Sequence, residues 1–251
     1  AGPARAVDAD IYREIETKYI FGFTTGSGIG LEGEKEFTVE SVGRFGKRTG
    51  RYAATETKYE FEFTPSQLIQ IEFGALGATH NVSNVMDLDD RRQMALSGAF
   101  AEFRYLAIER TDSQPLAVTL SFEPTWRRID ETGGEKVQNY EFETKINADL
   151  ELVKNRVYAG FNLLYEPETT KTLSGELERE AKIGVSSALA VRVHPNLVLG
   201  AEVWYLRHYD SLGLSEFTGD AVLLGPTLYW QLSRKTFLTA AWNAQVAGHE
   251  V

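Results

Sequence analysis

Hydrophobic and polar residues alternate along most of this chain. In the segment 140–152, every even position from Tyr140 to Leu152 is apolar or threonine, and every odd position from Glu141 to Glu151 is charged or asparagine. Successive side chains of a β-strand point to opposite faces, so this period of two predicts a strand with one apolar and one charged face. An α-helix would instead spread the charged residues around its whole circumference.

The same alternation predicts about twelve antiparallel strands of roughly ten residues, the length that a tilted strand needs to cross a bilayer. The predicted strands are 16–23, 36–45, 56–63, 69–74, 99–105, 118–127, 140–152, 157–166, 180–193, 197–205, 222–232 and 236–247. Short connections rich in Pro, Asn or Ser occur at 64–67, 153–155, 194–196 and 233–235. Longer polar connections occur at 79–94, 130–136, 168–178 and 210–220.

Two all-β architectures fit this alternation: a transmembrane up-and-down barrel of about twelve strands, with fourteen as the alternative, and a soluble sandwich or lipocalin-like barrel. The apolar face is uniformly apolar in nearly every strand, and glycines gather on the charged face, which favours the membrane barrel. Aromatic residues on the apolar face fit the girdles of such barrels. The predicted girdle residues are Tyr19, Phe23, Phe45, Tyr59, Phe63, Tyr105, Trp126, Tyr140, Tyr165, Tyr205 and Trp230.

Composition narrows the function classes. The chain has 251 residues, of which 43% are hydrophobic and 25% charged, so it is not a disordered tail. It contains no cysteine, which excludes disulfides, thiolate metal sites and cysteine nucleophiles. Its formal net charge of −10 argues against nucleic acid as a partner, because binding phosphates requires a surplus of Lys and Arg.

The chain resembles bacterial outer-membrane β-barrel proteins. The resemblance runs from about Glu14 to Ala247 and rests on the alternating strands, the two lengths of connection and the aromatic residues. The segments 17–23 (TKYIFGF) and 217–220 (FTGD) look like those of uncharacterised proteobacterial barrels. The resemblance implies a Gram-negative outer membrane as location and its lipid and lipopolysaccharide as partners. It identifies no protein partner and no functional residue.

If the apolar face meets lipid, the charged face lines the lumen. Its acidic residues are Glu16, Glu36, Glu40, Glu56, Glu60, Glu62, Glu72, Glu102, Glu123, Glu141, Glu143, Asp149, Glu151, Glu166, Glu180 and Glu202. Its basic residues are Lys18, Arg44, Lys58, Arg104, Arg127, Lys145, Lys182 and Arg192. A water-filled lumen with this acid surplus would form a narrow, cation-preferring passage for small solutes, the favoured interpretation. A lumen closed by paired charges would make the protein a structural anchor or scaffold for partner proteins.

A hydrolase acting on lipid or peptide is a further alternative, because barrel hydrolases use histidine with serine or aspartate. His80 could act with Asp87, Asp89 or Asp90, and His208 with Asp210. His194 and His249 lie in a turn and near the end of the sequence. A histidine near an aspartate is common by chance, so the sequence predicts no catalytic residue, no cofactor and no metal site. The glycine-rich stretch 26–30 lacks the lysine of a phosphate loop and is expected to be a flexible connection.

The chain is expected to form one barrel domain over residues 14–251, preceded by a flexible mature N-terminus at 1–13. Counting the alternating connections backwards from Pro65 starts the first strand on the wrong side. One predicted strand between residues 14 and 45 is therefore not expected to span. Counted forwards, the last strand ends at the rim that carries the long loops, so a closing strand is expected to follow it.

Overall fold

Backbone hydrogen bonds join the strands of this protein into one antiparallel sheet that follows chain order. The computed structural model describes residues 16–111 and 113–249. A single turn of 3₁₀ helix, η1 (Thr17–Tyr19), precedes the sheet. The strands are β1 (Lys35–Phe45), β2 (Arg51–Ser66), β3 (Ile69–Ser83), β4 (Arg91–Ile108), β5 (Leu116–Ile129), β6 (Lys136–Val153), β7 (Val157–Thr172), β8 (Leu177–His194), β9 (Leu197–Tyr209), β10 (Phe217–Ser233), β11 (Thr236–Ala241) and β12 (Ala244–His249).

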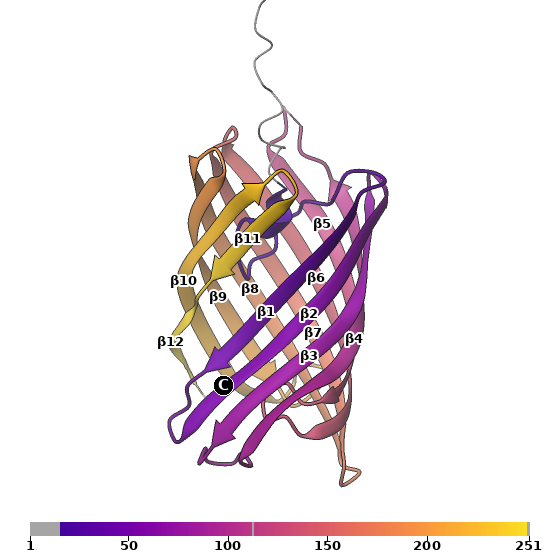
Figure 1. Ribbon diagram of the computed structural model, residues 1–251, viewed down its shortest axis with the longest axis vertical. Helices are drawn as coiled ribbons and strands as arrows, with labels where there is room; N and C mark the ends of the chain where they lie inside the picture. The colour runs from indigo at the N-terminus through magenta and orange to yellow at the C-terminus, as the bar shows by residue number, and fades with distance from the viewer. Residues whose placement is uncertain (1–15, 112, 250–251) are drawn as a thin grey trace, which may run out of the picture.

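The sheet curls into an up-and-down β-barrel (Figure 1), as the alternation predicted. β11 and β12 both pair with β10 and form one track that is interrupted at Trp242 and Asn243. The interruption faces Pro226, which has no N–H to donate to the ladder. Within the described residues, β1 pairs with β2 alone and the β11–β12 track with β10 alone, so no ladder joins the two sheet edges.

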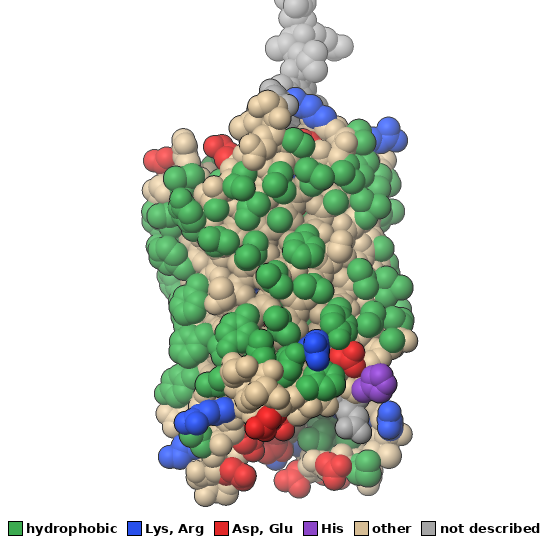
Figure 2. All heavy atoms as spheres, turned by 180° about the vertical axis from the view of Figure 1, so that it is seen from behind, with side chains coloured by type: hydrophobic (Ala, Val, Ile, Leu, Met, Phe, Trp, Pro, Cys, Tyr) green, Lys and Arg blue, Asp and Glu red, His purple; other side chains and the backbone are tan. Residues whose placement is uncertain are grey.

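The barrel wall has polar side chains inside and apolar side chains outside. In β5, Thr119, Glu123 and Arg127 are at most 7% exposed, whereas Phe122 and Trp126 are 45% and 41% exposed. Figure 2 shows the outer surface, where hydrophobic side chains cover the wall and charged ones gather toward the two ends. An exposed apolar surface of this extent is typical of a site that contacts a membrane or another protein. No helix within the described part of the chain is long and apolar enough to cross a membrane.

The connections alternate between the two ends of the barrel. One end, called here the short-turn end, carries 67–68, 154–156, 195–196 and 234–235, together with the longer connection 109–115. The other end, the loop end, carries 46–50, 84–90, 130–135, 173–176 and 210–216. Several loops are shorter than predicted, because the strands continue as polar hairpins past the apolar part of the wall. β7 and β8, for example, remain paired as far as Lys171 and Leu177.

The predicted strand at 16–23 is wrong, because η1 and an irregular loop replace it inside the barrel. Gly22 has a φ of +97°, which an extended strand does not adopt. The expectation that one segment between residues 14 and 45 does not span the wall is confirmed by this finding. The predicted flexible N-terminus at 1–13 lies outside the described residues.

Candidate functional site

Residues 16–34 are called here the plug segment: residues 16–30 lie inside the lumen at the short-turn end, and the exposed residues 31–33 lead on to β1 (Figure 1). Ile20 and Phe21 are both 0% exposed and pack with Tyr158, Val198 and Tyr229 of the wall. A Cβ atom at Gly160 would lie 3.0 Å from the Phe21 ring, so glycine leaves the space that this ring fills. The plug segment is therefore held by a small apolar core of its own within a polar lumen.

Three wall side chains bind the backbone and hydroxyl groups of the plug segment. Asp149 accepts hydrogen bonds from Thr17 Oγ1 at 2.7 Å and from both the amide and the hydroxyl of Ser27 at 2.6 Å. Glu202 accepts the amides of residues 23 and 24, at 3.1 and 2.7 Å. Asn162 both accepts from and donates to the backbone of residue 25, each at 2.7 Å. These bonds satisfy backbone groups that would otherwise be buried without partners.

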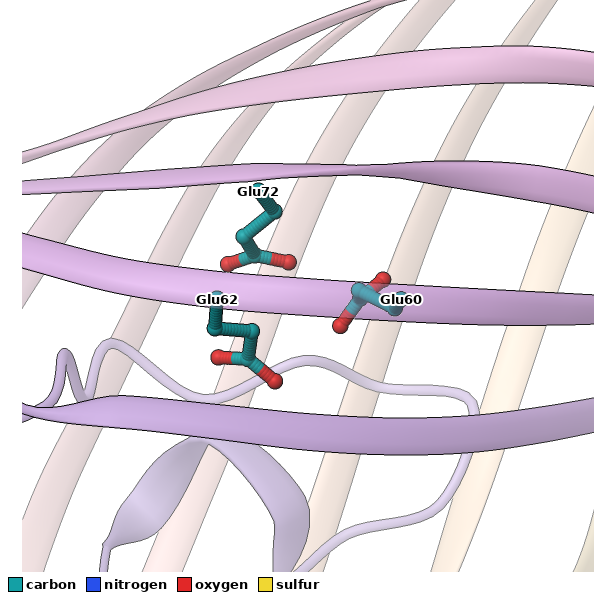
Figure 3. Close-up of side chains that lie close together, drawn as sticks. All are labelled: Glu60, Glu62 and Glu72. Carbon is teal, nitrogen blue, oxygen red and sulfur yellow. The ribbon is translucent and has the colours of Figure 1, made fainter.

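Lys18 places one ammonium group among three carboxylates of β2 and β3. Its Nζ lies 2.9 Å from Glu62, 2.7 Å from Glu72 and 3.7 Å from Glu60. Figure 3 shows these three glutamates projecting from adjacent strands beside the plug segment. Lys18, Glu62 and Glu72 are 7%, 0% and 1% exposed, so water screens this cluster little. The Tyr19 hydroxyl also donates to Glu62.

Arg104 of β4 holds the turn of the plug segment from the wall. Its guanidinium donates to the carbonyls of Gly26 and Gly28 at 2.9 and 3.2 Å, and it lies 3.3 Å from Glu102. Arg104 is 1% exposed. A Cβ at Gly26 would lie 2.0 Å from the Thr17 carbonyl oxygen, so only glycine fits this turn. The expectation that 26–30 is a flexible connection is therefore wrong, because the stretch is packed against the wall.

Further ion pairs fill the middle of the lumen and its loop end. Arg127 bridges Glu56 and Glu141, at 2.9 and 2.7 Å. Lys58 of β2 pairs with Glu123 of β5 at 2.5 Å, Lys145 pairs with Glu143 of the same strand at 2.6 Å, and Lys182 of β8 pairs with Glu166 of β7. At the ends of the strands, Glu180 is exposed, Glu151 accepts the amide of Asn155, and Arg192 donates to the Pro195 carbonyl.

The loop 130–135 folds inward at the loop end. His80 and Gln93 contact the carbonyls of Glu131 and Gly134, at 3.1 and 2.6 Å. Arg44 pairs with the Glu131 carboxylate at 2.8 Å. Burial would raise the pKa of Glu131, but the positive charges of Arg44 and Arg127 outweigh it and hold the pKa at about 2.

We expect this carboxylate to stabilise the barrel in a pH-dependent way. Because the pKa of Glu131 is lowered on folding, its contribution is complete above the unfolded value of about 4.3 and is lost as pH falls toward 2. The melting temperature of the native chain should therefore exceed that of Glu131→Gln at neutral pH, and the gap should close between about pH 4 and pH 2. Glu176→Gln, in an exposed loop, is the control. A gap that stays constant down to pH 2 would contradict the assignment.

The residues predicted to line the lumen or form the girdles lie partly on wall strands and partly on the plug segment. Lys18 lies in the lumen as predicted, but on the plug segment and not on a wall strand. Tyr19 and Phe23 are misassigned as girdle residues, because they also belong to the plug segment. Of the aromatic residues on the outer face, Phe45, Trp126 and Tyr140 lie toward the loop end, and Phe63, Tyr105 and Trp230 toward the short-turn end. Tyr59 and Tyr165 lie near the middle of their strands, and Tyr205 lies four residues before the end of β9.

The structure places His80 and His208, the two histidines considered for catalysis, in different surroundings. His80 is 1% exposed, and its ring nitrogens lie near Gln93 and the Glu131 carbonyl, whereas Asp90 accepts the Asn84 amide. His208 lines a small cavity with glutamates of β7 and β8. His194 lies 2.5 Å from Asn196, and His249 lies 3.2 Å from Asp220 on the surface.

Several neutral residues that hold the plug segment were missed. Asn162, Ser186 and Thr119 are at most 3% exposed and contact the plug segment directly. The available signal was their position on the lumen face, where Asn162 stands opposite Asn147 and Ser186 in the neighbouring strands. A neutral amide or hydroxyl at such a site indicates a specific hydrogen-bond partner inside the barrel.

One known protein family matches nearly the whole chain. Residues 13–250 match a family described as a family of unknown function, DUF6662. The chain belongs to the DUF6662 family. No curated protein matches it. The match includes both the barrel wall and the plug segment of this DUF6662 protein, so the segment lies within the unit that defines the family.

Proposed function

We propose that this DUF6662 protein is an integral β-barrel of the bacterial outer membrane, closed by its own N-terminal segment and serving as a membrane anchor for partner proteins. One observation carries the proposal: the outer wall is apolar, while charged side chains such as Glu62, Glu72 and Arg104 are at most 1% exposed inside it. An open, water-filled lumen would leave such side chains accessible. The short-turn end, where the plug segment enters, would face the periplasm.

The membrane proposal is tested by mixing the purified chain with lipid vesicles and floating them in a density gradient. We expect the protein to rise with the vesicles and to show a β-sheet circular dichroism spectrum without appreciable helix. A monodisperse protein that stays in the aqueous fraction without detergent would overturn the proposal. In planar bilayers the native chain should show no conductance steps, and a steady conductance would overturn the closed lumen.

A cation-preferring passage, opened when the plug segment leaves, is the second candidate. The acid surplus favours it: among the described residues, the buried acids of the wall are Glu56, Glu60, Glu62, Glu72, Glu102, Glu123, Glu141, Asp149, Glu166 and Glu202. The buried bases of the wall are Arg104 and Arg127, since Lys18 belongs to the plug segment. A chain lacking residues 16–33 should then conduct and prefer cations in a salt gradient. Anion preference would contradict this candidate.

A further inference from the structure

Glutamates of three adjacent strands, β6, β7 and β8, lie side by side near the loop end of the wall. In the β6–β7 ladder Glu141 stands opposite Glu168, and in the β7–β8 ladder Glu168 stands opposite Glu180. Like charges directly opposite each other destabilise a sheet. Arg127 pairs with Glu141 and Lys182 with Glu166, but among the described residues no Lys or Arg forms an ion pair with Glu168. Glu168 therefore has no direct ion-pair partner, whereas Glu141 and Glu166 each have one.

The carboxylates converge to the spacing of a cation site. Carboxylate oxygens of Glu141, Glu166 and Glu168 all lie within 4.8 Å of one another. Ca²⁺ binds oxygens at about 2.3–2.6 Å, so oxygens on opposite sides of the ion are about 4.6–5.2 Å apart. Mg²⁺, at about 2.0–2.1 Å, draws opposite oxygens to about 4.0–4.2 Å. Because the separations are at most 4.8 Å, one Ca²⁺ ion can contact all three carboxylates.

A buried amide oxygen supplies a second, independent indication of a ligand. Asn139 of β6 is 4% exposed, and its Nδ2 donates to Glu168 and to Thr170. Its Oδ1, on the same amide group and so at the edge of the same cluster, is buried and has no hydrogen-bond partner. A buried acceptor without a donor costs free energy, and a cation at the cluster would satisfy it.

The cluster also has a route of access. Glu166, Glu168, Glu180, Lys182 and His208 line a cavity on the lumen side of β7–β9, near the loop end. The other cluster of three carboxylates differs in this respect, because the Lys18 ammonium already lies between Glu60, Glu62 and Glu72. Among the described residues, the Lys18 cluster also borders an unsatisfied amide oxygen, Gln70 Oε1, but all three of its carboxylates contact the ammonium, whereas Glu168 has no ion pair and lines a cavity.

We propose that Glu141, Glu166 and Glu168, together with Asn139 Oδ1, bind a divalent cation, for which Ca²⁺ is the best fit. All four ligands are hard oxygen donors, as Ca²⁺ prefers, and carboxylates that bind through both oxygens can complete a coordination number of six to eight with water. The ion would link β6 to β7 where like charges oppose each other. The site does not depend on whether the lumen conducts.

Isothermal titration of CaCl₂ into the full chain in non-ionic detergent, after chelator treatment, tests the proposal. We expect one site per chain, with a dissociation constant of about 10⁻⁴–10⁻³ M, as in extracellular calcium modules, and weaker binding of MgCl₂. Glu168→Gln should weaken Ca²⁺ binding at least about tenfold, a loss of about 1.4 kcal/mol. Glu151→Gln, the same change at the other end of β6, is the matched control and should leave binding unchanged.

Three results would overturn the site: no saturable binding to the native chain, unchanged binding in Glu168→Gln, or equal weakening in Glu168→Gln and Glu151→Gln. The last result would mean that Ca²⁺ is a diffuse counterion of the acidic lumen. If Glu168→Gln does not fold, Asn139→Ala provides the test, since it removes a neutral oxygen and leaves the charge unchanged. Its Ca²⁺ affinity should fall several-fold, and native affinity in that variant would also overturn the site.

Discussion

Replacing Lys18 by methionine should destabilise the barrel by about 3–5 kcal/mol, the usual result of removing one partner from a buried ion pair. The ammonium is the only group of the plug segment that neutralises Glu60, Glu62 and Glu72. Without it, carboxylates that are at most 6% exposed face one another in a medium that screens them poorly. The free energy of unfolding, measured by denaturant titration in detergent with tryptophan fluorescence, checks this.

Two further variants make the test of Lys18 specific. Lys171→Met removes an exposed lysine from the β7–β8 hairpin and should change stability by less than about 0.5 kcal/mol. Adding Glu72→Gln to Lys18→Met removes one of the three carboxylates around the missing ammonium and should restore part of the loss, which a double-mutant cycle measures. If Lys18→Met is as stable as Lys171→Met, the cluster does not hold the plug segment in place.

The Gly26→Ala variant should release the plug segment while the wall stays folded. The new Cβ would lie 2.0 Å from the Thr17 carbonyl oxygen, which is backbone and cannot rotate away. Overpacking of this kind costs about 1–3 kcal/mol. The population of the released state should rise by about tenfold for each 1.4 kcal/mol. Arg104 would at the same time lose the two carbonyl acceptors that it holds.

Thiol labelling reports this release directly, because the chain contains no cysteine. Thr24 is 0% exposed, so a Thr24→Cys reporter should react with a maleimide slowly in the native background and at least about tenfold faster beside Gly26→Ala. Gly213→Ala is the matched control, since a Cβ there meets nothing within 4 Å. Equal labelling rates in the two backgrounds would show that the plug segment tolerates the substitution.

The wall of the barrel was predictable because its chemistry is periodic. Each wall strand has one face toward the lumen and one toward the exterior. The alternation seen in Glu56–Phe63 therefore recurs in the other wall strands. The pattern failed at 17–23, where Thr17, Tyr19 and Phe21 also alternate with other residues. Alternation shows that two faces differ, but not that the apolar face meets the exterior. For Phe21 that face is the interior of the lumen.

The contacts inside the lumen were not predictable from one sequence. Lys18 lies 44 residues from Glu62 and 54 from Glu72, and their meeting depends on how the plug segment enters the barrel. Wall pairs such as Lys58 with Glu123 depend on the shear of a whole curved sheet, which local alternation does not fix. Charge types on the lumen face were therefore inferable, whereas their partners were not.

The position of the plug segment also sets an order of events during folding. Thr17 binds Asp149, which is 132 residues later in the chain, and the carbonyl of Tyr19 accepts from Thr239, which is 220 residues later. The earliest described residues therefore cannot reach their final partners until β6 and β11 exist. Contacts between such distant residues form slowly. Refolding should thus end with a separate late phase in which the start of the chain docks into an already formed wall.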